Sequence, residues 1–318
     1  MSLAASRLGV GTDVAGSGRI PAAFCGLFSL KCSQDRLPGD GIATVLTGLP
    51  LASGTIALLS NDLDTLISCF KSIVNTHITN SNPMSLDLPW RDNSWSSVQR
   101  RRGSPSSGNG RLVLGIMACD GHVRPHPPIQ RAIEQVTRAL EAAGHETVQW
   151  TPPSHSPAVH NLFEIFGSTS AREAREAIDS SGEPPIPQIA DWYHNQDIEP
   201  NSTADFWELC HQRNEYCSRY KAYWNETGGI TRSGRVPDGV ILPVAATLAV
   251  RPGEFQYYGY SAIANVLDYP SGVFPVCMGD SNLDHLADQE ILSDLDAQVR
   301  STCKQNRPRM KHRCSDDC

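Results

Sequence analysis

The residues with the clearest chemical potential in this 318-residue chain lie near its start, where a serine stands between two glycines, Gly16-Ser17-Gly18. Glycines allow a backbone to turn sharply, so that several amide hydrogens can point to one place. A serine hydroxyl at such a turn can attack a carbonyl carbon while the amides hold the negative oxygen that forms. The pattern therefore fits a serine nucleophile and an oxyanion hole made by the N–H groups of Val14, Ala15, Gly16 and Ser17.

Two other interpretations of the glycine-rich stretch stay open on spacing alone. A phosphate-binding loop would need a glycine at position 14, where the chain has Val14, and no strand is expected ahead of the loop. A purely structural turn fits the glycines as well as an active-site turn does. The nucleophile-elbow pattern Gly-x-Ser-x-Gly does not surround Ser17 and so cannot decide between them.

A longer run of residues favours the active-site turn. Residues 11–31 read Gly-Thr-Asp-Val-Ala-Gly-Ser-Gly-Arg-Ile-Pro-Ala-Ala-Phe-Cys-Gly-Leu-Phe-Ser-Leu-Lys, which resembles the core of the amidase signature family. Residues 120–128 and 253–276 are similar to the fungal acetamidase-like branch of that family. Two positions depart from the family pattern, because Gly18 replaces a branched apolar residue and Ser29 replaces a glycine.

The resemblance implies a role for several residues. Ser17 would form the acyl-enzyme, with residues 14–17 as its oxyanion hole. Asp13 and Arg19 would form a local ion pair that shapes the loop and takes no part in proton transfer. The resemblance also places three residues in the wall of the acyl pocket as substrate contacts: Tyr260, Asn265 and Tyr269.

The family's other two catalytic groups, a lysine base and a serine in a cis peptide, lie upstream of the nucleophile. The residues before Ser17 contain neither a lysine nor the Gly-Ser-Ser-Gly segment that carries the second serine. Lys31 matches the structural lysine that ends the signature, so it is not expected to replace the base. We therefore expect a truncated chain, incomplete at both ends, whose amidase activity is impaired.

The implied function is a hydrolase that cleaves the C–N bond of small aliphatic or aryl-alkyl amides through a serine acyl-enzyme. No metal or organic cofactor is needed for that chemistry. One alternative is a non-catalytic protein or partial gene product that keeps the fold. Another is a Ser-His-Asp hydrolase, for which no oriented His–Asp pair can be named.

Composition limits the partners of this chain. The formal net charge is −7 and 40% of the residues are hydrophobic, which indicates a globular protein that does not bind nucleic acid. No apolar run approaches the length of a membrane span, and the start lacks the layout of a signal peptide. We expect a cytoplasmic enzyme with a small-molecule amide substrate, and the sequence is compatible with a homodimer.

The family resemblance, together with alternating strand and helix patterns, implies an α/β/α fold around a mixed, mainly parallel sheet. Apolar spacing and turn residues predict a series of elements: helices over 63–74, 127–143, 158–180 and 204–227, and strands over 112–117, 145–150 and 239–244. Strand, helix and strand in succession imply a parallel crossover between residues 112 and 150. An amidase domain over residues 1–300 would thus contain a loop insertion at about 75–110 and be followed by a disordered tail over 301–318.

Three further patterns carry weaker signals. His122 and His126 flank a turn and are expected to face solvent, since a metal would need more ligands nearby. The triple arginine at 100–102 is expected to lie on a solvated loop. A set of potential zinc ligands in the tail fits no common spacing: Cys303, His312, Cys314 and Cys318.

Overall fold

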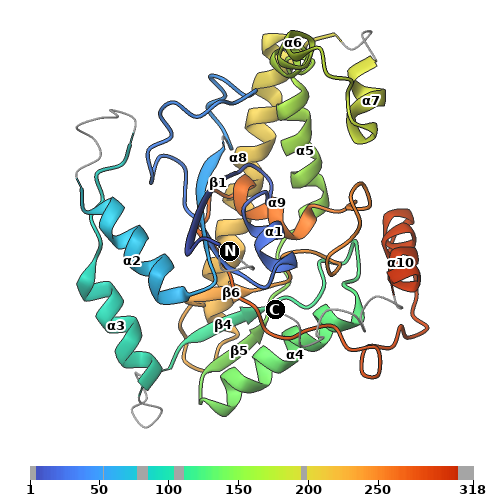
Figure 1. The fold of residues 1–318 in the computed structure, drawn as a ribbon. Coiled ribbons are helices and arrows are strands. Elements are labelled where there is room, and N and C mark those ends of the chain that lie inside the picture. Colours follow the sequence, from blue (N-terminus) through green and yellow to red (C-terminus); the bar gives the residue numbers. More distant parts are fainter. Residues whose placement is uncertain (1–4, 53, 77–84, 104–110, 195–198, 307–318) are drawn as a thin grey trace.

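The chain folds into two small sheets packed with helices, as seen in a computed structural model that describes residues 5–306 except 53, 77–84, 104–110 and 195–198 (Figure 1). One sheet is antiparallel, with the strand order β1-β3-β2-β7. Its strands are β1 (Leu8–Asp13), β2 (Phe28–Lys31), β3 (Thr55–Ser60) and β7 (Ser271–Val273). The register pairs Asp13 with Thr55, so the strand that leads to Ser17 ends beside the start of β3.

The second sheet is parallel and contains the predicted crossover. β4 (Val113–Ile116) lies between β5 (Glu146–Gln149) and β6 (Gly239–Ile241). Helix α4 (Pro127–Ala142) connects β4 to β5 and begins with two prolines, which suit the first turn of a helix. The α/β class and the mixed strand directions are confirmed, but the described strands form two sheets, and the larger one is antiparallel.

Helix α2 (Leu63–Val74) packs against the antiparallel sheet, and α3 (Asp92–Gly103) lies beyond α2 at the left of Figure 1. The side chain of Asp62 caps α2 by accepting from the Thr65 amide at 2.9 Å. The existence of α3 corrects the expectation of a loop at 75–110, at least for its described part. This helix has little apolar character, so hydrophobic periodicity gives no sign of it.

The helical region after β5 is divided where one helix was predicted. α5 (His155–Gly167) and α6 (Arg172–Ser181) are separated by a turn at Ser170 and Ala171, which both have positive φ. α7 (Pro187–His194) and α8 (Thr203–Glu226) follow, and a single 3₁₀ turn at Thr227–Gly229 ends α8. A capping box between Ser202 and Asp205 fixes the start of α8.

The aromatic residues in the second half of α8 belong to the core, as predicted, whereas Trp207 near its start is exposed. Tyr216 and Tyr220 are buried, and the Tyr220 hydroxyl accepts a hydrogen bond from the indole of Trp150 at 3.0 Å. Trp150 is 1% exposed and also stacks edge-on against Trp224. These contacts hold α8 against the parallel sheet through β5, which ends just before Trp150.

Three more helices complete the description: α1 (Arg19–Phe24), α9 (Gly259–Val266) and α10 (Asp294–Asn306). Figure 1 places α1 and α9 together at the centre of the molecule and α10 at its right edge. α10 continues past Arg300 into the segment that composition predicts to be disordered, and Thr302 is buried in it. Residues 307–318, with most of the proposed zinc ligands, lie outside the described residues.

Candidate active site

Ser17 lies in the tight connection between β1 and α1, and it is exposed. A strand therefore leads directly into the glycine-rich loop, which corrects the expectation that none precedes it. Val14 still occupies the position where the phosphate-binding fingerprint requires glycine, so the fingerprint stays incomplete. The turn itself depends on Gly16, whose φ of +130° is rarely adopted by residues with a side chain.

A buried ion pair closes the loop. Asp13 is 0% exposed and Arg19 is 2% exposed. The guanidinium donates twice to the carboxylate, from Nε to Oδ2 and from Nη2 to Oδ1, each at 2.9 Å. Such a two-point pair ties the end of β1 to the start of α1 across the serine. The loop-shaping role of both residues stays a prediction.

The Asp13 carboxylate is held in its charged form. Burial raises its pKa, but the hydrogen bond and charge of Arg19 lower it more, with help from Asn265 and the Gly16 amide. The net pKa lies below the ordinary value of an aspartate. A carboxylate that is buried, charged and bound on both oxygens is a poor proton acceptor.

Helix α9 supplies the remaining partners of the ion pair, although it lies far away in the sequence. Asn265 accepts from Arg19 Nη2 at 2.6 Å and donates to Asp13 Oδ1 at 3.1 Å. The Arg19 Nη1 group donates to the Ser261 carbonyl at 2.8 Å. The Ser261 hydroxyl in turn donates to the Ala15 carbonyl at 2.6 Å. The signature loop and α9 thus form one buried hydrogen-bonded unit.

These bonds fix the direction of the loop amides. In a trans peptide the N–H points opposite to the C=O of the preceding residue. The Gly16 carbonyl accepts from the Arg19 and Ile20 amides at the start of α1, so the Ser17 N–H points away from that helix. The Asp13 carbonyl accepts from Asn265 and Thr55, so the Val14 N–H points away from α9 and β3.

One of the four predicted oxyanion donors has another partner. The Gly16 amide donates to Asp13 Oδ1 at 2.8 Å, so it supports the loop from within. Among the described residues, no hydrogen bond joins the amides of Val14, Ala15 and Ser17 to an acceptor. The oxyanion role of these three amides stays a prediction.

Gly18, where the family pattern has a branched residue, is matched by a contact on β3. A Cβ atom at position 18 would overlap the methyl group of Ala57, which is fully buried. The Gly18 amide also donates to Asp13 Oδ2 at 3.2 Å. The absence of a side chain at Gly18 therefore fits the close packing of the loop against β3.

The three predicted substrate contacts lie in different surroundings. Asn265 is 3% exposed and uses its side chain in the Asp13–Arg19 network, so here it holds the loop and does not face a substrate. Tyr260 is 2% exposed, and its hydroxyl donates to the Val123 carbonyl at 2.6 Å. Tyr269 is half-buried and packs edge-on against Trp224, and its contact with substrate stays a prediction.

Lys31 is buried, as expected of a structural lysine. Its Nζ donates to the carbonyls of Tyr269 at 3.1 Å and Ala264 at 3.3 Å, at the end of α9. Burial lowers the pKa of this amine to about 8, and the nearby charge of Arg19 also lowers it. An amine enclosed in this way supports the helix that holds the loop and is out of reach of a substrate.

We expect the stability of the chain to rise with pH because of Lys31. Below pH 8 the amine is charged in both the folded and the unfolded chain, so the cost of burying the charge is fully present. Between pH 8 and 10.5 only the unfolded chain keeps the proton, so folding becomes more favourable. The shift corresponds to about 3 kcal/mol of unfolding free energy.

Urea denaturation of the wild type and of Lys31→Met from pH 7 to 10 measures this effect. The variant loses two hydrogen bonds at every pH, so only the change in the difference with pH is informative. Because both proteins share all other titrating groups, the rise of unfolding free energy that is due to Lys31 should appear in the wild type alone. Parallel pH profiles would show that the buried amine keeps an ordinary pKa.

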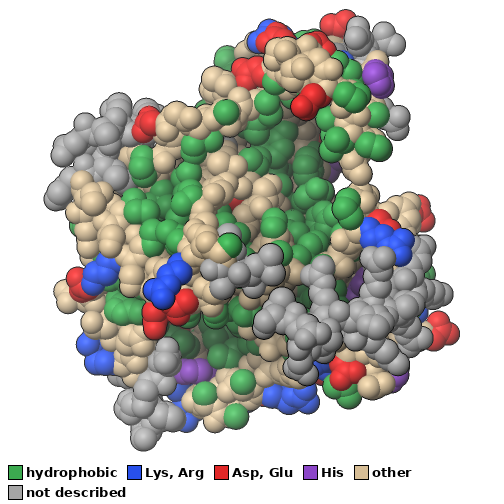
Figure 2. Space-filling view, in the orientation of Figure 1, with side chains coloured by type: hydrophobic (Ala, Val, Ile, Leu, Met, Phe, Trp, Pro, Cys, Tyr) green, Lys and Arg blue, Asp and Glu red, His purple; other side chains and the backbone are tan. Residues whose placement is uncertain are grey.

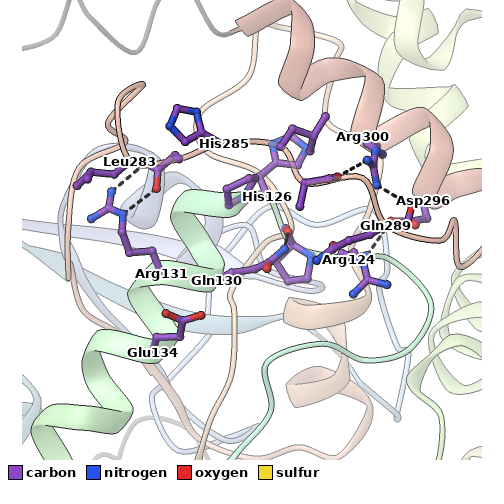
Figure 3. Close-up of a pocket in the computed structure, with 15 residues that line it drawn as sticks. Arg124, His126, Gln130, Arg131, Glu134, Leu283, His285, Gln289, Asp296 and Arg300 are labelled. Carbon is purple, nitrogen blue, oxygen red and sulfur yellow. Dashed lines mark hydrogen bonds and ion pairs between the residues drawn. The ribbon is translucent and has the colours of Figure 1, made fainter.

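A separate cavity of about 230 Å³ lies between α4 and the segment that leads to α10 (Figure 3). Arg131 faces Asp284 across it and donates twice, at 2.7 and 2.9 Å. His126 lines the cavity but is 5% exposed, with Nε2 at 2.9 Å from the Val299 carbonyl, which corrects the expectation that it faces solvent. The lining residues include none of the predicted catalytic or substrate-binding residues.

Within the described residues, no group of three or more histidine, cysteine, aspartate or glutamate side chains could hold a metal ion. The helices described by the structure also include none whose length and apolar character would let it cross a bilayer.

Hydrophobic side chains gather on the middle of the face shown in Figure 2. A row of aromatic rings in mutual contact begins at Phe24, the last residue of α1, and continues through Phe255, Tyr258 and Phe163. Tyr258 and Phe163 are 39% and 42% exposed. α1 begins two residues after Ser17, and a rise of about 1.5 Å per residue places Phe24 roughly 8 Å along the helix from Arg19. The sequence gives no indication of this row, because its members come from three separate segments.

Comparison with known proteins gives a consistent result. The family model described as Amidase matches residues 2–290. The acetamidase of Aspergillus oryzae is 34% identical over 293 residues, which is 92% of this chain and 52% of that protein. The acetamidase of Emericella nidulans is 32% identical, with the same shares of the two chains. The chain thus spans about half the length of these curated relatives.

Solved structures share the fold. A structure of fatty acid amide hydrolase superposes with a TM-score of 0.80 at 23% identity, over 93% of this chain and 50% of that one. The structure of 6-aminohexanoate cyclic dimer hydrolase complexed with substrate gives a TM-score of 0.64 at 17% identity, over 86% and 58% of the two chains.

Proposed function

The chain belongs to the amidase family, and we propose that it takes part in the hydrolysis of carboxylic amides with Ser17 as nucleophile. The Ser17 oxygen adds to the amide carbon, and its proton passes to a base. The carbonyl oxygen becomes an anion, the C–N bond then breaks, and the amine leaves with a proton. Water adds to the resulting ester, releases the acid and restores the serine.

The observation that carries this proposal is the fixed loop around an exposed serine. The Ser17 and Val14 amides have their directions set by carbonyls that are bonded elsewhere. Donors aligned before the reaction stabilise a developing oxyanion without a cost of reorganisation. Together with the Ala15 amide they form the oxyanion hole of the proposed mechanism.

The aromatic row from Phe24 to Phe163 supports an amide with an apolar acyl group. Half-exposed rings near a nucleophile favour aliphatic or aryl substituents, which lose contact with water on binding. The acetamidase relatives carry names that fit small amides. We propose small aliphatic or aryl-alkyl amides as substrates, and no metal or organic cofactor takes part in the steps above.

The base is the part of the mechanism that the described residues do not supply. Among them, no lysine, histidine or carboxylate side chain hydrogen-bonds the Ser17 hydroxyl. The family resemblance implies that a lysine and a second serine, upstream of the nucleophile, perform this step. If the protein lacks that step, the second candidate applies, a non-catalytic protein that keeps the fold.

Labelling with a serine-directed fluorophosphonate tests both candidates. An unassisted serine hydroxyl is a weak nucleophile, and oxyanion donors and binding alone give only about 10³–10⁴-fold acceleration over water. We expect little labelling of the 318-residue chain. A chain that carries the upstream segment of an acetamidase relative ahead of Met1 should be labelled strongly and hydrolyse amides.

Ser17→Ala in the extended chain is the control and should abolish both labelling and turnover. Strong labelling of Ser17 in the 318-residue chain would contradict the impairment, since another group would then have to activate it. Labelling that survives Ser17→Ala would reject Ser17 as the nucleophile. An extended chain that folds but is not labelled and does not hydrolyse amides would favour the non-catalytic candidate.

A further inference from the structure

We infer that Ser261 of α9 is a positioning residue that sets the direction of the oxyanion amides through the Ala15 carbonyl. The inference rests on the proposed function for its catalytic meaning, while the geometry it describes can be tested independently. Ser261 stands far from Ser17 in the sequence and matches no part of the signature run. Only the fold brings it to the loop.

The Ser261 hydroxyl is committed to this contact. The side chain is 1% exposed, and its Oγ lies 2.6 Å from the Ala15 oxygen but 3.2 Å from the Tyr258 oxygen. A hydroxyl has one proton to donate, and the shorter bond goes to the loop. Ala15 is itself buried, at 8% exposure, so its carbonyl has no ready access to water as a substitute donor.

The C=O and the N–H of the peptide group between Ala15 and Gly16 are therefore held by different parts of the chain. Ser261 holds the Ala15 oxygen, and Asp13 Oδ1 holds the Gly16 N–H at 2.8 Å. Rotation of this peptide would break both bonds. The neighbouring amides of Ala15 and Ser17 keep their directions only while the peptide between them stays fixed.

Close packing reinforces the contact. A Cβ atom on Gly16 would lie 2.5 Å from the Ser261 oxygen and 2.7 Å from its Cβ, so the two residues meet with no space between them. The Arg19 guanidinium also donates to the Ser261 main-chain carbonyl at 2.8 Å. Ser261 thus binds the loop through its side chain and the ion pair through its backbone, and only the first bond is removed by Ser261→Ala.

Residue-resolved amide hydrogen exchange on the 318-residue chain tests this geometry. In Ser261→Ala the Gly16 amide should exchange at least 10-fold faster, because the peptide can move away from Asp13. Amides in the middle of α8 should keep their rates. Ser218→Ala removes a hydroxyl that donates to Asn214 on the exposed side of α8, and it should leave the Gly16 rate unchanged.

Kinetics on an active, extended chain test the catalytic meaning. Because the oxyanion exists only in the transition state, Ser261→Ala should lower kcat by 10-fold or more and leave KM within a factor of two. An unchanged Gly16 exchange rate, or equal acceleration at Gly16 and in α8, would overturn the inference. A rise of KM by 10-fold or more at unchanged kcat would also overturn the inference.

Absence of turnover in every extended chain would reject the proposed function. The exchange result would then still decide whether Ser261 holds the loop.

Discussion

Asp13→Asn is expected to lower the free energy of unfolding by about 3–5 kcal/mol at neutral pH, because it leaves the Arg19 charge buried without its partner. Urea denaturation measures the loss. Asp92→Asn is the matched control, since Asp92 pairs with Lys71 at 2.7 Å but both side chains are exposed. An exposed pair of this kind contributes about 0–1 kcal/mol.

The pH dependence gives the same prediction a second test. The folded-state pKa of Asp13 is lowered, so its contribution is fully present above the unfolded pKa. It is lost as the pH falls through the folded pKa, where the wild type should approach the variant in stability. Unchanged unfolding in Asp13→Asn, together with lost activity in an extended chain, would indicate a direct chemical role for the carboxylate.

Gly16→Ala is expected to cost about 2–6 kcal/mol of unfolding free energy and to remove any labelling of Ser17. The methyl group would lie 2.5 Å from the Ser261 oxygen and 2.6 Å from Ile20 Cδ1. Overpacking of this kind costs about 1–3 kcal/mol, and the φ of +130° adds about 1–3 kcal/mol of backbone strain.

Gly26→Ala is the control for backbone strain alone. Gly26 also has positive φ, at +66°, but nothing lies within 4 Å of the added methyl group. Gly26→Ala should lower the free energy of unfolding by about 1–2 kcal/mol, the cost of a left-handed conformation. Equal losses at positions 16 and 26 would show that the contact with α9 is not tight.

The predictable parts of the fold were those governed by local signals. The crossover from β4 through α4 to β5 follows from apolar periodicity and the two prolines that open the helix. The break between α5 and α6 could not be anticipated, because Ala171 has no sequence preference for positive φ and adopts it only in this tertiary setting. The polar helix α3 lacked the periodicity on which a prediction depends.

The candidate site likewise contains residues that the sequence identifies and contacts that only the fold creates. Ser17, Asp13 and Arg19 are neighbours in the sequence, and a family pattern identifies them together. The bonds of Asn265 and Ser261 to the loop join residues about 250 positions apart, and no spacing rule reaches that far. Asn265 is predicted as a substrate contact, but its partners are Asp13 and Arg19, since a buried ion pair needs polar groups around it.

The dependence of the loop on α9 has a consequence for the order in which the protein can mature. Residues 13–19 leave a ribosome long before α9 does, yet the buried Arg19 guanidinium gains its partners on residues 261–271 only when those residues have been made. Contacts between segments so distant form slowly, because most of the chain must first be ordered between them. A nascent chain thus carries Ser17 in an unformed loop, and the amides of that loop take their final directions only after α9 has been synthesised.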